Sequence, residues 1–299
     1  MRLITEAEVA ARLDPASAVD ALRAAFAQLG RGQAQVLARH RATSTQDGAS
    51  LAISAMGAIL EADGVLPAVL GTKVYSARNG KYHFLVSLFS AATGAPLATL
   101  EANEFTRLRT AAATAVATDL LALPDAKTLA IFGAGIQARA HAEALMRLRR
   151  FERVLVCARS GGEAFAAELG AQAVDAATAA READVIVTAT RSATPLFDGG
   201  LVKPGAFVAA VGSSTRAARE LDDTLLDRAS LIAVEWWTAA ELEAGDLVYS
   251  APERWTELGE LLVKPGPRGP RDIVVYKSVG IGLEDVALAR FVAHRLGVC

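Results

Sequence analysis

The stretch Thr128-Leu129-Ala130-Ile131-Phe132-Gly133-Ala134-Gly135-Ile136-Gln137-Ala138 decides the fold of this chain. Its apolar start is typical of a buried strand, and a Gly-x-Gly-x-x-Ala turn then leads into a helix. Gly133 allows the tight turn, Gly135 lets the backbone approach a pyrophosphate, and Ala138 lets helix and strand pack closely. The N-terminus of the helix attracts the negative charge. An ordinary glycine-rich turn is the alternative, but the strand and helix context predicts dinucleotide binding by Gly133, Ala134, Gly135, Ile136 and Gln137.

The residues around this stretch alternate between strand and helix patterns. We expect helices over 138–149 and 162–169, and strands over 154–157, 185–189, 207–211 and 231–234. Alternating strands and helices indicate a parallel sheet with crossover connections. The pattern predicts an α/β protein with a doubly wound, Rossmann-type domain over residues 124–279.

The N-terminal part has a different pattern. The first thirty residues read as helices, with a capping box from Thr5 to Glu8 and a helix start at Asp14-Pro15. Short apolar runs over 51–59, 65–74, 84–89 and 96–100 then alternate with turn residues. A helix follows over 106–121. We therefore expect a smaller α+β domain over residues 1–123, built on an antiparallel sheet.

Composition excludes several classes of protein. The 299 residues are 52% hydrophobic and 21% charged, with a net charge of −2, so the chain is globular and has no charge pattern for binding nucleic acid or an anionic membrane. Two cysteines make no disulfide framework, and no residues have metal-ligand spacing. The acidic residue Glu6 comes too early for a secretory signal. A soluble, cytoplasmic protein is the expectation.

The end of the second predicted strand bears on the type of cofactor. An NAD site favours an acidic residue there for the ribose hydroxyls, whereas an NADP site favours Arg or Ser for the 2′-phosphate. Cys157 and Ala158 stand at this point, and Arg159 and Ser160 follow. A solvated loop arginine is the alternative, but the residues favour NADP(H), with NAD(H) possible.

Three cationic residues outside the Rossmann part are candidates for substrate binding. Lys73 interrupts an apolar strand, either as an edge charge or as an inward-facing cation. Arg109 lies near the start of an Ala-rich helix, where it opposes the helix dipole unless it binds an anion. Arg41 lies in an expected loop, where a surface charge is the more common role.

Six motifs occur in an order that resembles the ornithine cyclodeaminase/mu-crystallin family. They are Gly71-Thr72-Lys73, the run from Thr106 through Arg109-Thr110-Ala111-Ala112, the Gly133 to Ala138 turn, Val211-Gly212-Ser213-Ser214, Arg219-Glu220-Leu221-Asp222, and Tyr276-Lys277-Ser278-Val279-Gly280 with Glu284-Asp285 behind it. The resemblance implies an N-terminal substrate and dimerisation domain, completed by residues 280–299. It also implies a homodimer and chemistry on a small α-amino or α-imino acid.

The resemblance gives roles to single residues. It implies that Lys73 and Arg109 are substrate ligands and that Arg41 binds the substrate carboxylate. We expect Ser214 and Ser278 to line the nicotinamide, Thr188, Val211 and Gly212 to contact the cofactor, and Val279 to contact the substrate.

Two serines distinguish between the activities found in the family. Ornithine cyclodeaminases carry aspartate at the position of Ser214 and glutamate near Ser54, and a serine is no general base without an activating partner. We therefore expect an NADP(H)-dependent reductase of cyclic ketimines, which makes proline or pipecolate. The alternatives are an ornithine cyclodeaminase with bound NAD, an amino-acid dehydrogenase, and a mu-crystallin-like nucleotide-binding protein without catalysis.

Overall fold

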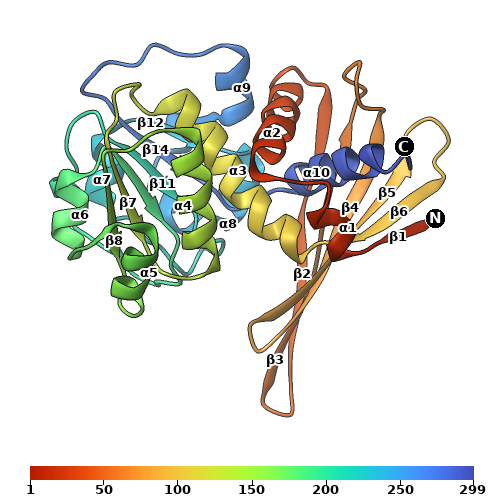
Figure 1. The fold of residues 1–299 in the computed structure, drawn as a ribbon, viewed down its shortest axis with the longest axis horizontal. Coiled ribbons are helices and arrows are strands. Elements are labelled where there is room, and N and C mark those ends of the chain that lie inside the picture. The colour runs from red at the N-terminus through yellow and green to blue at the C-terminus, as the bar shows by residue number, and fades with distance from the viewer. The chain divides into compact units, whose positions relative to one another are not determined.

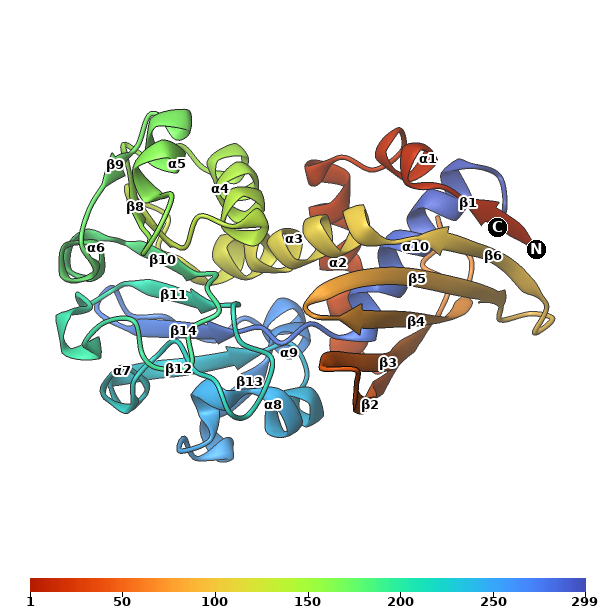
Figure 2. The ribbon, with the colours of Figure 1, turned by 90° about the horizontal axis from the view of Figure 1, so that it is seen from below.

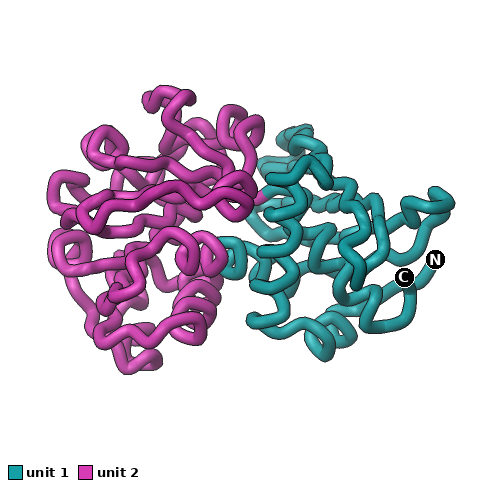
Figure 3. The backbone as a smooth tube through the Cα atoms, turned by 90° about the horizontal axis from the view of Figure 1, so that it is seen from above, with its two compact units in different colours: residues 1–113, 281–299 teal, residues 114–280 magenta.

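The computed structural model describes residues 1–299, and the chain divides into two compact units (Figure 3). One unit contains Met1–Ala113 and Ile281–Cys299, and the other contains Thr114–Gly280. The division falls inside helix α3 (Asn103–Leu121), about ten residues before the boundary expected at Pro124. Residues 111–117 of α3 are buried.

The unit Thr114–Gly280 is a doubly wound α/β domain, as predicted. Its eight strands form one sheet in the order β13-β12-β14-β11-β10-β7-β8-β9, and every neighbouring pair is parallel. The strands are β7 (Thr128–Phe132), β8 (Arg153–Cys157), β9 (Gln172–Ala173), β10 (Val185–Thr188), β11 (Phe207–Ala210), β12 (Ala229–Val234), β13 (Trp255–Glu257) and β14 (Ile273–Lys277). The chain runs outward from β7 to β9 and then continues on the other side of β7 with β10.

Helices connect these strands (Figure 1). They are α4 (Ile136–Leu148), α5 (Gly162–Leu169), α6 (Ala176–Glu182), α7 (Asp223–Arg228), α8 (Trp237–Glu243) and α9 (Leu258–Val263), with the short 3-10 helices η1 (Gly199–Leu201), η2 (Gly245–Leu247) and η3 (Pro252–Arg254). Strands β7, β10, β11 and β14 are buried along their whole length, which explains their continuous apolar sequences. Strand β14 lies between β11 and β12 and was missing from the predicted elements.

The other unit contains a six-stranded sheet in the order β1-β6-β5-β4-β3-β2. The strands are β1 (Arg2–Ile4), β2 (Ala34–Gln46), β3 (Ala49–Leu60), β4 (Val69–Arg78), β5 (Lys81–Ser90) and β6 (Pro96–Glu101). The predicted antiparallel pairing is confirmed for β2 to β6, whereas β1 is parallel to β6. Arg41 lies within β2, so the expected loop at this position is wrong.

This unit also contains α1 (Glu6–Ala10), α2 (Pro15–Gly30), the first part of α3 and α10 (Gly282–Arg295). The capping box of Thr5 and Glu8 and the Asp14 cap are both present, as predicted. Helix α10 runs across strands β3, β4 and β5 (Figure 2). A Cβ atom at Gly71 of β4 would lie 2.8 Å from the Val286 side chain, so glycine is needed for this close approach. No helix is long and apolar enough to cross a lipid bilayer.

Candidate functional site

The glycine-rich turn after β7 has the backbone geometry that a dinucleotide needs. Gly133 has a φ of +116°, and a Cβ atom there would lie 2.7 Å from the Ala189 carbonyl oxygen. The Gly133 N–H donates to the Cys157 carbonyl oxygen at 2.8 Å, which ties the turn to β8. Helix α4 begins at Ile136, which is 71% exposed, and its cap residue Gly135 has no side chain. The helix N-terminus is therefore open to an anion, which fits a pyrophosphate.

The predicted cofactor residues meet at one edge of the sheet. Parallel pairing aligns Phe132 at the end of β7 with Cys157 of β8 and Thr188 of β10, and it aligns Ala210 of β11 with Lys277 of β14. Arg159 and Ser160 follow β8 and are exposed, Val211 and Gly212 follow β11, and Ser278 follows β14. Ligands of open α/β sheets bind at this carboxyl edge.

A buried carboxylate holds two of the loops at this edge. Glu220 is fully buried and accepts hydrogen bonds from the Thr188 hydroxyl at 2.8 Å and the Gly212 N–H at 2.7 Å. The Thr190 N–H and hydroxyl also donate to Glu220, at 2.8 and 2.7 Å. The Thr188 side chain and the Gly212 amide thus contact Glu220. These contacts fix the shape of the loops that were predicted to contact the cofactor.

An ion pair extends this network. Asp246 and Lys277 are buried, and their carboxylate and ammonium groups are 2.8 Å apart. Asp246 also accepts from the backbone amides of Glu220 and Leu221, at 2.6 and 2.9 Å. Burial raises the pKa of Asp246, but Lys277 and the two amides outweigh it and lower this pKa below its ordinary value.

A second buried carboxylate, Glu235, holds the turn that follows β14. It accepts hydrogen bonds from the Ser278 hydroxyl at 2.6 Å and from the Val279 and Gly280 amides at 2.9 and 2.7 Å. The Tyr276 hydroxyl also donates to it, at 3.2 Å. Ser278 and Val279 are nearly inaccessible to solvent. Their polar groups therefore hold the turn, and their contacts with cofactor and substrate stay predictions.

Ser214 and its neighbour differ in their surroundings. Ser213 is buried, and its hydroxyl donates to the Ala218 carbonyl oxygen at 2.6 Å. Ser214 is partly exposed in the loop after β11. The structure assigns no basic or acidic partner to the Ser214 hydroxyl, so nothing there would activate it as a general base.

Lys73 is the inward-facing cation of the two possibilities that its sequence left open. It is 1% exposed, and its ammonium group donates to Asp285 at 2.8 Å and to the Thr106 hydroxyl at 2.7 Å. It also lies 4.5 Å from the centre of the Phe84 ring. Burial lowers the pKa of Lys73 from 10.5 to about 8, although Asp285 opposes this effect. The Lys73 ammonium therefore gives up its proton more readily than that of an ordinary lysine.

Arg109 belongs to the same cluster. It is 8% exposed, and its guanidinium donates to Glu284 at 2.9 Å. Its Nε lies 4.0 Å from the Asp285 oxygen that binds Lys73. Because α3 begins at Asn103, Arg109 lies beyond the first helical turn, and the expected opposition to the helix dipole does not apply. Glu284 and Asp285 of α10 hold this arginine in the unit that carries Lys73.

Arg41 lies on the same face of the sheet as Lys73. Its Nε donates to the Ser54 hydroxyl at 3.1 Å, and its Nη2 donates to the Tyr75 hydroxyl at 3.0 Å. The Tyr75 ring centre is 5.9 Å from the Lys73 ammonium. The structure therefore brings together the three predicted substrate cations, Arg41, Lys73 and Arg109, through shared neighbours.

Arg39 is a cation that the sequence analysis missed. The pairing of β2 with β3 shifts between Leu37 and His40, so two residues of β2 oppose Met56 at a β-bulge. Met56 pairs with Lys73, and the charge of Arg39 contributes to the lowered pKa of Lys73. Arg39 and Arg41 are two residues apart in β2, so strand alternation places both on one face, and the loop expected at Arg41 hid this signal.

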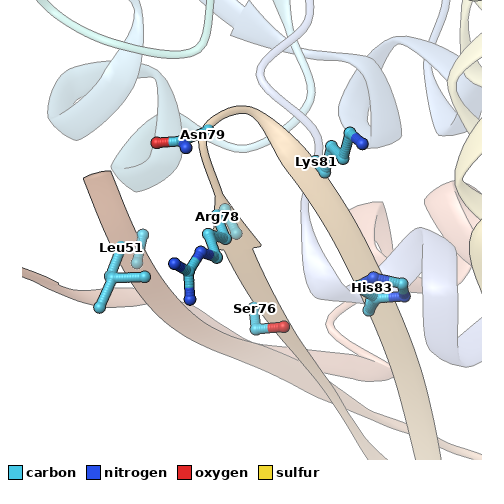
Figure 4. Close-up of a pocket in the computed structure, with 8 residues that line it drawn as sticks. Leu51, Ser76, Arg78, Asn79, Lys81 and His83 are labelled. Atoms are coloured by element: carbon cyan, nitrogen blue, oxygen red, sulfur yellow. The ribbon is translucent and has the colours of Figure 1, made fainter. Parts of the chain in front are cut away.

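A pocket lies beside the hairpin that joins β4 and β5 (Figure 4). Ser76, Arg78 and His83 line it, and Ser76 pairs with His83 across β4 and β5. These residues alternate with Lys73 and Tyr75 along the strands, so they face the other side of the sheet. No group of three His, Cys, Asp or Glu side chains lies close enough to hold a metal ion.

Comparisons with known proteins identify the family of this chain. The model of the ornithine cyclodeaminase/mu-crystallin family matches residues 1–297. The ketimine reductase mu-crystallin of Mus musculus is 37% identical over 213 residues, which cover 69% of this chain and 67% of the relative. The iminosuccinate reductase of Paracoccus denitrificans is 31% identical over 98% of this chain and 96% of its own length.

A solved structure of another enzyme has a similar fold along the whole chain. The Thermococcus litoralis Δ1-pyrroline-2-carboxylate reductase in complex with NADH and L-proline has a TM-score of 0.87 and 29% identity, and the match covers 99% of this chain and 98% of that one. The chain therefore belongs to the ornithine cyclodeaminase/mu-crystallin family, and it is an NAD(P)-dependent enzyme that acts on carbon–nitrogen bonds.

Proposed function

We propose that this protein uses NADPH to reduce cyclic ketimines that carry a carboxylate, pyrroline-2-carboxylate and piperideine-2-carboxylate, to proline and pipecolate. One observation carries the proposal: a buried lysine with a pKa of about 8 lies in one cluster with two arginines. A cyclic ketimine acid needs a cation for its carboxylate and a protonated nitrogen at its imine. The cluster supplies both.

The residues of the cluster have separate roles in this mechanism. Arg41 and Arg109 bind the substrate carboxylate. Lys73 holds a proton close to the imine nitrogen, and Asp285 and Thr106 orient its ammonium group through their hydrogen bonds. The nicotinamide, when bound, supplies a hydride to the imine carbon. Glu284 keeps Arg109 in place, because it binds this arginine and also caps the start of α10 through the Ile281 N–H.

The choice of NADPH depends on the end of β8. Arg159 and Ser160 are exposed there, next to the glycine-rich turn, and no carboxylate stands at Cys157 or Ala158. A cationic side chain at this point favours the 2′-phosphate. Two relatives of known structure hold NADH and NAD+, so both coenzymes belong in the test.

The positive charge of Arg39 supports a second candidate substrate, an imino acid with two carboxylates. A further cation next to Lys73 suits a second carboxylate, as in an acyclic imino dicarboxylate, and a relative that aligns with nearly the whole chain is an iminosuccinate reductase. The reaction would be the same imine reduction. Ornithine cyclodeamination is disfavoured, because Ser54 carries no negative charge and Ser214 has no partner that would activate it as a base.

We also propose a homodimer through the face of the sheet that α10 leaves uncovered. Strand register places five apolar side chains on this face, each at least 40% exposed: Leu37, Ile53, Ile59, Val74 and Leu85. Several exposed apolar side chains on one face of a sheet are typical of an interface. A structural relative is an archaeal alanine dehydrogenase dimer.

Initial rates test the function. NADPH oxidation and NADH oxidation are measured with pyrroline-2-carboxylate, piperideine-2-carboxylate and iminosuccinate, and ammonia release is measured with ornithine and NAD+. We expect the highest kcat/KM with NADPH and a cyclic ketimine. Lys73→Met should lower kcat/KM by a factor of about 100 or more and leave the Kd for NADPH unchanged. Ammonia and proline from ornithine, or normal turnover by Lys73→Met, would overturn the proposal.

A further inference from the structure

We propose that Tyr75 is a positioning residue for the substrate carboxylate: with Ser54, it holds the guanidinium of Arg41 in its binding orientation. The proposal rests on the proposed function in one respect, since it takes Arg41 as a ligand of the substrate carboxylate. The Tyr75 hydroxyl accepts a hydrogen bond from Arg41 at 3.0 Å. In this role Tyr75 acts through Arg41 and makes no contact with the substrate.

Strand register places these residues in one row across the sheet. Arg41 of β2 pairs with Ser54 of β3, Ser54 pairs with Tyr75 of β4, and Tyr75 pairs with Phe84 of β5. Paired residues of neighbouring strands point to the same face, so all four side chains lie on the face that carries Lys73. Regular pairing of four strands therefore fixes the positions of these residues, and no loop is involved.

Burial differs sharply along this row. Arg41 is exposed, whereas Ser54 is 1% exposed and Tyr75 is 7% exposed. An exposed arginine ordinarily samples many rotamers, and ordering it on binding costs free energy. Two buried hydroxyls that accept from its Nε and Nη2 fix the plane of the guanidinium before the substrate arrives. The consequence is a preorganised binding group.

The Tyr75 ring is itself held in place. Its centre lies 5.2 Å from the Phe84 ring, and Phe84 stacks on Tyr82 with centres 5.7 Å apart and planes 9° apart. The Lys73 ammonium lies 4.5 Å from the centre of the Phe84 ring. The hydroxyl of Tyr75 is thus positioned by aromatic packing, so removing the hydroxyl alone leaves the ring and the wall beside Lys73 intact.

The chemical nature of the two partners also matters. A hydroxyl accepts a hydrogen bond and carries no charge. The contacts with Ser54 and Tyr75 therefore orient the Arg41 guanidinium and bring no negative charge of their own.

The test compares Tyr75→Phe and Ser54→Ala with the matched control Tyr82→Phe, which removes a hydroxyl from the same aromatic cluster at a residue that is 47% exposed. Isothermal titration gives the Kd for pyrrole-2-carboxylate, a flat cyclic carboxylate, and steady-state kinetics gives KM and kcat for the imino acid. Titration with NADPH monitors the other ligand. Phenylglyoxal modification of Arg41, followed by peptide mass spectrometry, reports the anchoring of the guanidinium without any substrate.

We expect Tyr75→Phe to raise the Kd for pyrrole-2-carboxylate and the KM about tenfold, the size of one lost hydrogen bond to a charged group. The kcat at saturation and the Kd for NADPH should stay within twofold of the parent protein. Arg41 should be modified several times faster in Tyr75→Phe and Ser54→Ala, but not in Tyr82→Phe. Unchanged carboxylate binding together with unchanged modification of Arg41 would overturn the proposal. If the parent protein neither reduces ketimines nor binds pyrrole-2-carboxylate, the proposed function fails, and the modification rates alone decide whether Tyr75 anchors Arg41.

Discussion

The substitution Asp285→Asn tests the proton-holding role of Lys73 directly. Asp285 lies 2.8 Å from the Lys73 ammonium, and both side chains are at most 1% exposed. A neighbouring carboxylate in such a pair ordinarily raises the pKa of its partner by about 1 to 3 units. Without it, burial and the charge of Arg109 act unopposed, and the pKa of Lys73 should fall from about 8 to between about 5 and 7.

The fall in pKa sets the size of the effect on the rate. At pH 7.5, a group with a pKa of about 8 is roughly three-quarters protonated, and one with a pKa between about 5 and 7 is protonated in at most about a quarter of the molecules. If the reaction needs the proton, kcat/KM at pH 7.5 should fall between about 3-fold and about 200-fold. The lost activity should return as the pH is lowered through the new pKa.

The assay is the pH profile of kcat/KM for NADPH oxidation with a cyclic ketimine between pH 5.5 and 9.5. The parent protein should lose activity above pH 8, and Asp285→Asn should lose it at a lower pH. Glu152→Gln is the matched control, because it breaks a lysine–carboxylate pair with Lys127 in which both side chains are 62% exposed. Its profile should match that of the parent, and any titration of the substrate affects all three profiles equally.

The pH dependence of the free energy of unfolding reports the pKa of Lys73 independently of activity. The folded pKa of Lys73 lies below its unfolded value of 10.5, so the native state binds fewer protons between pH 8 and 10.5, and stability rises with pH in that window. In Asp285→Asn the window should begin below pH 8, with a slope of about 1.4 kcal/mol per pH unit in urea unfolding. A variant that loses activity equally at every pH, with the basic limb still at pH 8, would refute the reasoning.

Three further predictions concern the other parts of the chain. Arg159→Leu should raise the KM for NADPH about tenfold or more and leave the KM for NADH nearly unchanged, and an equal effect on both coenzymes in initial-rate assays would contradict the role of this arginine. Glu220→Gln places an amide against four donors, so urea unfolding should show a loss of about 3 to 5 kcal/mol. Glu182→Gln, at a partly exposed ion pair with Arg153, should cost less than about 1 kcal/mol. Ile53→Asp puts a charge on the exposed sheet face and should convert the proposed dimer to monomer, and a dimer mass that persists in light scattering would reject this interface.

The Rossmann part could be predicted from sequence because its signals are local. A strand, a Gly-x-Gly turn and a helix follow one another within twenty residues, and strands β7, β8, β10 and β11 agree with expectation within one residue. Strand β14 was missed although Ile273–Lys277 is rich in β-branched residues, since it follows a Pro/Gly-rich loop and no helix pattern leads into it. Asp246 lies in a stretch with two glutamates, which gives no sign of burial in the sequence, yet its side chain is buried and pairs with Lys277.

The substrate cluster could not be predicted in the same way, and the reason is physical. Lys73 and Asp285 are 212 residues apart, and Arg109 and Glu284 are 175 apart, so no sequence window contains either ion pair. Within helix α10, Glu284 and Asp285 look like ordinary acidic residues of a first turn, favoured there by the helix dipole. Only the packing of α10 against the sheet buries them, and burial turns two ordinary carboxylates into the groups that set the charge of Lys73 and the position of Arg109. The protonation state of the cluster is therefore a property of tertiary structure, and the pH dependence of the Asp285 variant measures it.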